Sequence, residues 1–175
     1  MTNISYIPNL FISVAYDSKN GIGKNNSIPW YLPEDLKYFS KLTKGNGNNA
    51  IIMGKNTWLS LPKKPLKGRD NLILSKTLEI NENSPKNNLI KTFKYLNSIM
   101  EFSKEQNYDE VWIIGGSEIY NLFLNKLKVK RIYATLIDKD YECDTFFPLI
   151  NNWTIVNKES TIKDNIKITY FTFEN

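Results

Sequence analysis

The chain has 175 residues, of which 41% are hydrophobic and 13% aromatic, so it is not an intrinsically disordered protein, and we expect one domain spanning residues 1–175. It contains no histidine and a single cysteine, which excludes imidazole catalysis, an internal disulfide and a structural zinc site; no metal is expected. The formal net charge of +5 is compatible with a phosphate-rich ligand, but the lysines form no single stripe, so nucleic acid is not expected as a partner.

The first half of the chain alternates between strands and helices. Residues 1–11 have no basic region ahead of their apolar stretch, so we expect no signal peptide, and no apolar run reaches the ~20 residues of a membrane span. A cytoplasmic location is therefore expected. A glycine-rich loop at 20–27 leads into a helix that begins with Pro33, which suits the first helical position. The elements predicted in this half are strands at 10–16, 50–53 and 71–75 and helices at 33–43 and 55–61.

The second half continues this alternation and closes with two strands. Residues 77–88 are polar and expected to be loose, and residues 138–148 are expected to form a long acidic loop. The predicted elements are strands at 89–92, 110–114, 131–137, 154–159 and 167–173 and helices at 95–104 and 117–124. This order predicts an α/β fold with a central, mostly parallel eight-stranded sheet, an antiparallel C-terminal strand and about four flanking helices.

The helix predicted at 33–43 carries the first candidate for chemistry. At roughly 100° per residue, Asp35 falls inside the apolar stripe, whereas Glu34 falls on the polar side. The stripe consists of Leu32, Leu36, Phe39 and Leu42. A carboxylate in apolar surroundings is unfavourable unless a polar group meets it, which makes Asp35 a site candidate. The alternative is an acid that only complements the positive end of the helix dipole.

Three strand ends are candidates for binding phosphate, at 54–57, 74–76 and 114–117. In open α/β sheets, ligands bind beyond the carboxyl ends of the strands, where glycines allow close approach to the backbone. Neither a P-loop nor a GxGxxG fingerprint is present, so we predict only a nucleotide-like ligand. Arg69, one of two arginines, lies on a predicted turn, where it either holds a carboxylate or is simply solvated.

Taken together, these segments resemble the dihydrofolate reductase family, from about Leu10 to the final strand. The resemblance rests on Ala15 and Phe39 and on GIG at 21–23, IPW at 28–30, LPEDL at 32–36, IMGKNTW at 52–58, PLKGR at 65–69, IIGGSEIY at 113–120 and DTFFP at 144–148. It implies reduction of dihydrofolate to tetrahydrofolate with NADPH as the cofactor, in one-carbon, thymidylate and purine synthesis. It also implies a monomer that antifolates inhibit.

The resemblance assigns roles to individual residues. Asp35 would bind the pterin, Thr135 would support Asp35, and Trp30 would help to order the water that delivers a proton. Desolvation is expected to raise the pKa of Asp35. The implied substrate-binding residues are Ser13, Asp35, Leu36, Phe39, Leu61, Leu66, Arg69, Ile114 and Thr135. The implied cofactor-binding residues are Ala15, Ile22, Gly54, Lys55, Thr57, Leu74, Ser75, Lys76, Gly115, Gly116, Ser117, Glu118, Ile119 and Tyr120. The Gly115–Gly116 peptide is expected to be cis.

Three other interpretations remain open at this point. The related-fold reductase of riboflavin synthesis also uses NADPH, but it lacks the combination of Pro29-Trp30 with Leu32-Pro33 and Asp35 found here. A catalytically silent nucleotide-binding module and a basic nucleic-acid binder are the other two. The presence of Asp35, Trp30, Thr135 and Arg69 together argues against a silent module.

Overall fold

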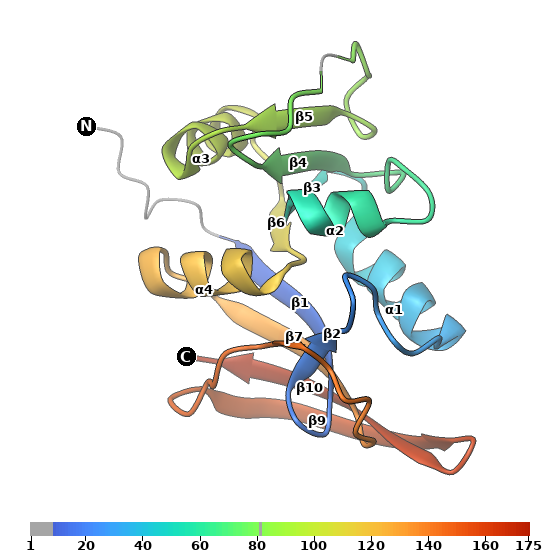
Figure 1. Cartoon of the computed structure of the whole chain (residues 1–175). Coiled ribbons are helices and arrows are strands. Elements are labelled where there is room, and N and C mark those ends of the chain that lie inside the picture. The colour runs from blue at the N-terminus through green and yellow to red at the C-terminus, as the bar shows by residue number, and fades with distance from the viewer. Residues whose placement is uncertain (1–8, 81) are drawn as a thin grey trace.

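The computed structural model describes residues 9–80 and 82–175. Its main sheet has eight strands in the order β5-β4-β3-β6-β1-β7-β10-β9 (Figure 1). The strands of this sheet are β1 (Leu10–Asp17), β3 (Asn49–Gly54), β4 (Asp70–Leu74), β5 (Ile90–Phe93), β6 (Glu110–Ile113), β7 (Arg131–Ile137), β9 (Thr154–Lys163) and β10 (Ile166–Glu174).

The pairing of these strands confirms the predicted fold class. Strands β5, β4, β3, β6, β1 and β7 pair in parallel, with Phe11 of β1 opposite Trp112 of β6 and Arg131 of β7. The C-terminal strand β10 pairs antiparallel with both β7 and β9. In the described part of the chain the helices are α1 (Pro33–Lys44), α2 (Lys55–Ser60), α3 (Leu96–Glu105) and α4 (Ser117–Lys126).

The helices divide between the two faces of the sheet, with α1 and α2 on one face and α3 and α4 on the other (Figure 1). Because successive side chains of a strand point to opposite faces, each central strand supplies both cores. The α3/α4 core includes Ile12, Ile52, Ile113 and Phe123, and the α1/α2 core includes Phe11, Ile51, Met53, Trp58 and Trp112. Each fully buried large side chain contributes about 1.5–3 kcal/mol to folding.

Two short strands were not predicted. The glycine-rich loop contains β2 (Gly21–Gly23), and the segment expected to be an acidic loop contains β8 (Thr145–Phe146). They pair antiparallel as a separate two-stranded sheet, with Gly21 opposite Phe146 and Gly23 opposite Thr145. Both strands are too short to show an alternating pattern, so periodicity could not reveal them. Their pairing ties the start of the glycine-rich loop to a segment more than a hundred residues later.

The other differences concern the ends of elements. The terminal strands β9 and β10 and helix α4 extend further than predicted, and β9 is exposed along almost its whole length. The described part of 77–88 contains neither a helix nor a strand, as expected, while position 81 and residues 1–8 lie outside the described residues. None of the helices described for this chain has the length and apolar character needed to cross a membrane.

Candidate active site

The α1/α2 face of the central strands is packed less completely than the opposite face. Ser13 and Ala15 of β1 and Ile114 after β6 are only half-buried, although they belong to the middle of the sheet. Thr135 lies opposite Ala15 in the β1–β7 register and is buried. The small side chains of Ser13 and Ala15 therefore leave the sheet surface accessible near Thr135.

The Asp35 carboxylate meets Thr135 across this face. The Thr135 hydroxyl donates a 2.9 Å hydrogen bond to Oδ1 of Asp35, which joins α1 to β7. Burial raises the pKa of Asp35, and this single hydrogen bond opposes the rise without cancelling it. The predicted direction of the pKa shift is thus confirmed. A carboxyl group with a raised pKa and few donors is a common feature of functional sites.

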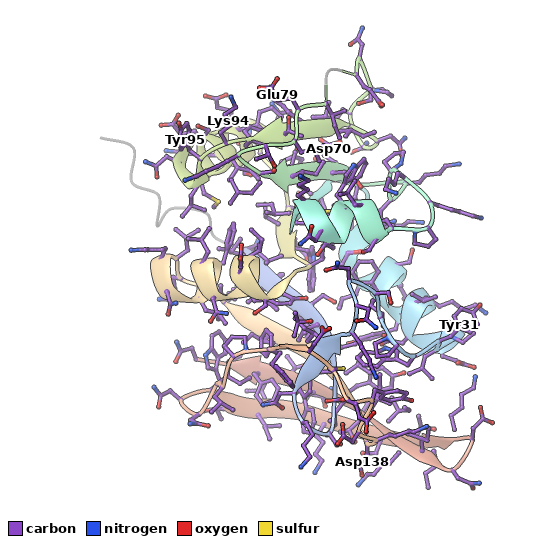
Figure 2. The ribbon with its side chains drawn as sticks, in the orientation of Figure 1. Tyr31, Asp70, Glu79, Lys94, Tyr95 and Asp138 are labelled. Carbon is purple, nitrogen blue, oxygen red and sulfur yellow. The ribbon has the colours of Figure 1, made fainter. Side chains whose placement is uncertain are left out.

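Glu34 behaves differently although it is the adjacent residue. It is exposed and forms an ion pair with Lys163 at the end of β9. The hydrogen bond from Lys163 lowers the pKa of Glu34. The helical wheel therefore separated the two acids correctly. Asp35 faces Thr135 on the sheet, and Glu34 lies on the solvent side of α1. Tyr31, labelled in Figure 2, is also exposed near this end of α1.

Apolar side chains beside Asp35 are left without a full set of packing partners. Leu36 is 54% exposed, and Phe39 on the next turn of α1 is only half-buried. The apolar side chains of α1 are therefore not fully packed into the core, since Thr43 is the only buried residue within α1. The remaining predicted lining residues, Leu61, Leu66 and Ile114, are half-buried at the edge of the α1/α2 core.

Arg69 is buried rather than solvated, with 3% of its surface exposed. Its Nε and Nη2 atoms donate to the carbonyl of Lys67, and its Nη1 atom donates to the hydroxyl of Thr43. The guanidinium carbon also lies 6.0 Å from the ring centroid of Phe39. Burial lowers the pKa of Arg69 to about 10.

The hydrogen bonds of Arg69 leave part of the guanidinium unused. The guanidinium has five N–H groups, and three of them donate hydrogen bonds here. One N–H group therefore remains free on each of Nη1 and Nη2. Within residues 9–80 and 82–175, no carboxylate forms an ion pair with it. A buried cation with a free pair of parallel donors is suited to an anionic ligand with two acceptor oxygens.

The Gly115–Gly116 peptide is cis, as expected from the resemblance. The Gly115 carbonyl accepts a 2.9 Å hydrogen bond from the N–H of Gly54, so the ends of β3 and β6 are tied together. Helix α4 begins directly afterwards, at Ser117, and no side chain caps its first turn. Its first N–H groups therefore have no partner within the helix and are available to an anion.

Close packing maintains this glycine turn. A Cβ atom on Gly54 would come within 3.0 Å of Ile119, and one on Gly115 within 3.3 Å of the Tyr120 hydroxyl. Gly115 also has a φ of 123°, which side-chain-bearing residues rarely adopt. The Tyr120 hydroxyl donates a 2.8 Å hydrogen bond to the Ser13 carbonyl, and burial raises the pKa of Tyr120. Tyr120 thus links α4 to β1 instead of facing the solvent.

A polar cluster lies beyond the ends of β3 and β4. The Lys55 ammonium donates to the Thr77 hydroxyl at 3.2 Å, and the Ser75 hydroxyl accepts hydrogen bonds from the N–H groups of Thr77 and Leu78. Lys55 and Lys76 are exposed. The Thr57 hydroxyl lies beside the glycine turn instead, 3.5 Å from the Cβ position of Gly115.

The loop that contains Trp30 is attached to the segment after β7. The rings of Trp30 and Tyr141 lie 5.3 Å apart, and the Asp17 carboxylate accepts hydrogen bonds from the N–H groups of Lys19, Gly21 and Tyr141. Ile22 in β2 and Ala15 in β1 flank this junction and are half-buried. Asp17 and Tyr141 were not singled out in the sequence because neither belongs to a recognisable motif.

The structure thus gathers the predicted residues into two groups. Between α1 and the sheet, Asp35 contacts Thr135, and Phe39 lies beside Arg69. Within residues 9–80 and 82–175, no hydrogen bond or ring contact brings Ser13 or Leu36 to them. The glycine turn, α4 and the Lys55 cluster lie at the strand ends. Thr43, which orients Arg69, was missed. Its position four residues after Phe39, on the same side of α1, is the signal that could have identified it. In the part of the chain that the structure describes, no cluster of acidic or cysteine side chains is arranged to hold a metal.

Comparison with known proteins identifies the family. The sequence model of the dihydrofolate reductase family matches residues 9–175. The chain is 42% identical to the viral dihydrofolate reductase of Saimiriine herpesvirus 2 over 146 residues, which cover 79% of this chain and 68% of that protein. It is 37% identical to the dihydrofolate reductase of Drosophila melanogaster over 149 residues, 81% of this chain and 79% of the relative. The match to the enzyme of Ureaplasma parvum is 32% over 152 residues, 87% and 89% respectively. The chain therefore belongs to the dihydrofolate reductase family of oxidoreductases.

Proposed function

We propose that this protein reduces 7,8-dihydrofolate to 5,6,7,8-tetrahydrofolate with NADPH. The observation that carries the proposal is Asp35, a carboxyl group with a raised pKa and one hydrogen bond, beside the exposed side chain of Leu36. This pairing of one polar anchor with an apolar surface suits a flat heteroaromatic ring that bears an amino group. The product supplies one-carbon units for thymidylate and purine synthesis.

Asp35 and Thr135 bind and orient the pterin. The free oxygen of the Asp35 carboxylate accepts hydrogen bonds from the 2-amino group and a ring nitrogen, while Thr135 keeps the carboxylate in place through Oδ1. Leu36, Phe39 and Ile114 pack against the ring and exclude water, which strengthens the polar contacts. The proton for N5 arrives through a water molecule that Trp30 helps to order.

Arg69 holds the other end of the substrate. Its two free N–H donors bind the α-carboxylate of the glutamate tail in a fork, and its bonds to Thr43 and to the Lys67 carbonyl keep the guanidinium oriented before substrate arrives. Leu61 and Leu66 then pack beside the benzoyl group. This two-ended attachment fixes the reacting carbon relative to the cofactor site.

The residues at the strand ends fit NADPH. The cis Gly115–Gly116 turn and the uncapped start of α4 at Ser117, Glu118 and Ile119 offer N–H groups to a diphosphate. The residues proposed for the 2′-phosphate and adenosine are Lys55, Thr57, Leu74, Ser75 and Lys76, and the backbone of Ala15 and Ile22 is proposed for the nicotinamide. Gly54 and Tyr120 keep the turn in position. When bound, NADPH supplies the hydride that is added at C6.

We further propose that the enzyme is a cytoplasmic monomer and that antifolates occupy the pterin position. An antifolate with a 2,4-diaminopyrimidine ring presents to Asp35 the same arrangement of amino group and ring nitrogen as the substrate. Inhibition should therefore be competitive with dihydrofolate and should weaken when Asp35 is replaced.

The test is the oxidation of NADPH, followed by its absorbance, in the presence of dihydrofolate, with NADH as the alternative cofactor. We expect rapid turnover with NADPH, slower turnover with NADH, and a rate that titrates with a carboxyl group. Asp35→Asn is the informative variant and Glu34→Gln its matched control. Binding of NADPH without turnover would point to another substrate and would refute the proposal.

A further inference from the structure

A cavity of about 180 Å³ lies between α1 and the hairpin of β9 and β10, and Asp35 forms part of its wall. Glu34 of α1, Thr161 and Lys163 of β9 and Tyr170 of β10 also line it. Of these residues, only Asp35 belongs to the proposed substrate site. The cavity is therefore a second space beside the same carboxyl group.

The strand order places this cavity and the proposed substrate site on opposite sides of Asp35. Thr135, which donates to Asp35, is opposite Ala15 of β1 in the parallel register. In the antiparallel register Thr135 is opposite Tyr170 of β10. Directly opposite residues point to the same face of a sheet, so Ala15, Thr135 and Tyr170 form one row. The proposed pterin contacts lie on the β1 side of this row, whereas the cavity lies on the β10 side (Figure 1).

The lining of the cavity is polar and suited to water. Glu34 and Lys163 form an ion pair in its wall, and Thr161 contributes an exposed residue with a hydroxyl group. A water molecule needs only roughly 10–15 Å³ of such space and two to four polar partners. The cavity therefore has the size and the chemistry to hold several water molecules in contact with the solvent.

Tyr170 limits the cavity on the side of the sheet. Its ring packs edge-on against Tyr38 of α1, with the centroids 5.0 Å apart. The same residue lines a neighbouring cavity of about 260 Å³, together with Glu159 of β9. Burial raises the pKa of Tyr170, and the charges of Asp35 and Glu34 raise it further. Tyr170 thus stands between two spaces and close to both carboxylates.

We propose that water in the first cavity hydrates Asp35 from the side opposite the substrate and exchanges its proton with the solvent, and that Tyr170 is the positioning residue that limits this water. The role of Asp35 in this inference rests on the proposed function. The carboxyl group gives its proton to a cavity water and takes one back from it, so no other reactant is needed.

Burial is the main cause of the raised pKa of Asp35, and the hydrogen bond from Thr135 is the opposing cause. The amount of water around the carboxyl group should therefore control its titration. The other titratable or charged groups gathered around Asp35 are Glu34 and Tyr38 of α1, Tyr133 of β7, Tyr170 of β10, and Glu159 and Lys163 of β9.

Thr161→Phe tests the inference by filling the cavity from its exposed wall. Less water around Asp35 should raise its pKa, so the carboxyl titration of the reduction rate should move to higher pH by about 1 pH unit. The profile of kcat/KM reports the free enzyme, and that of kcat reports the substrate complex. We expect the shift in both profiles, because the substrate covers only the other side of Asp35.

Two further variants and a matched control sharpen the test. Tyr170→Ser should join the two cavities, admit more water and move the titration to lower pH, whereas Tyr170→Phe keeps the ring and should keep the wild-type midpoint. Ser160→Phe is the control for the added ring. It is the neighbouring position on the opposite face of β9, where the Ser160 hydroxyl meets that of Thr169, so the midpoint should stay in place.

Unmoved profiles in both Thr161→Phe and Tyr170→Ser would overturn the inference, as would an equal shift in Ser160→Phe. Urea denaturation provides a measurement without turnover. At neutral pH, Asp35→Asn should stabilise the Thr161→Phe protein more than it stabilises wild type, because the ionised carboxyl group is less hydrated there. This larger difference in a protein that does not reduce dihydrofolate would refute the proposed function and support the cavity. Turnover with equal differences and unmoved profiles would do the reverse.

Discussion

Asp17 of β1 and Asp35 of α1 are two carboxylates with opposite surroundings. Asp17, at the end of β1, is fully buried, and its oxygens accept hydrogen bonds from three backbone N–H groups. The Cys143 thiol donates a further hydrogen bond to Oδ2 of Asp17 at 3.5 Å. Asp35 accepts one hydrogen bond, from Thr135. Burial opposes ionisation of both, but the N–H groups around Asp17 outweigh it and lower its pKa, whereas the pKa of Asp35 stays raised.

The difference shows that the number of hydrogen-bond donors around each carboxylate decides the direction of its pKa shift once burial opposes ionisation of both. The lone pairs of Asp17 are occupied by the loops that it joins, so Asp17 has no capacity for a ligand. Asp35 keeps an oxygen free beside the exposed side chain of Leu36. Under the proposed function, the bound substrate supplies the further donors.

The largest effect is expected from Asp35→Asn. Asp35 is proposed to anchor the pterin, so loss of its negative charge should lower kcat/KM by about 10³-fold, or roughly 4 kcal/mol of transition-state stabilisation. Steady-state kinetics with saturating NADPH measure this effect. An activity within tenfold of wild type would contradict the role assigned to Asp35.

The stability of the same variant should change in the opposite direction. Because the folded pKa of Asp35 is raised, the folded state binds its proton more tightly than the unfolded state does, and stability falls as the pH rises from the ordinary value of 3.8 through the folded pKa. Asp35→Asn removes this titration. Urea denaturation should therefore show a variant at least as stable as wild type at neutral pH.

The next effect is expected from Asp17→Asn. Replacing one carboxylate oxygen by an NH₂ group places a donor against backbone donors, which should reduce the free energy of unfolding by about 2–4 kcal/mol. The stability that Asp17 contributes is present above pH 3.8 and is lost as the pH falls through its lowered folded pKa, so the variant should also be less sensitive to acid. Urea denaturation at several pH values tests both statements, and an unchanged midpoint would show that the loop junction does not need the charge.

A smaller effect is expected from Thr135→Val, which removes the one donor to Asp35 and keeps the shape of the side chain. The hydrogen bond stabilises the ionised form of Asp35, so its loss should raise the pKa of Asp35 further and move the carboxyl titration of the reduction rate to higher pH. The expected loss of stability is about 1 kcal/mol. The pH–rate profile is the decisive measurement, because a purely structural role for Thr135 would leave its midpoint in place. Thr135→Ser should preserve the wild-type profile.

The smallest effect is expected from Glu34→Gln. Glu34 is exposed, and its ion pair with Lys163 is screened by solvent, so neither the unfolding midpoint nor kcat should change measurably. The comparison with Asp35→Asn is matched in position and chemistry. A loss of activity comparable to that of Asp35→Asn would mean that the two acids of this helix act together.

Local patterns in the sequence were sufficient for most of the fold. Hydrophobic periodicity predicts the strands of the main sheet and the four helices, and the helical wheel separates Asp35 from Glu34. These features depend on residues a few positions apart, which is the range over which periodicity carries information. The resemblance to the family added the cis Gly115–Gly116 peptide.

Other features were decided only by the tertiary structure. The pairing of β2 with β8 and the hydrogen bond from Tyr141 to Asp17 join segments more than a hundred residues apart. Arg69 was predicted on a turn, and its burial depends on Thr43 and Phe39 of a different element. Whether a polar side chain is satisfied, and how its pKa moves, is determined by donors brought together from distant parts of the chain, and no local pattern records them.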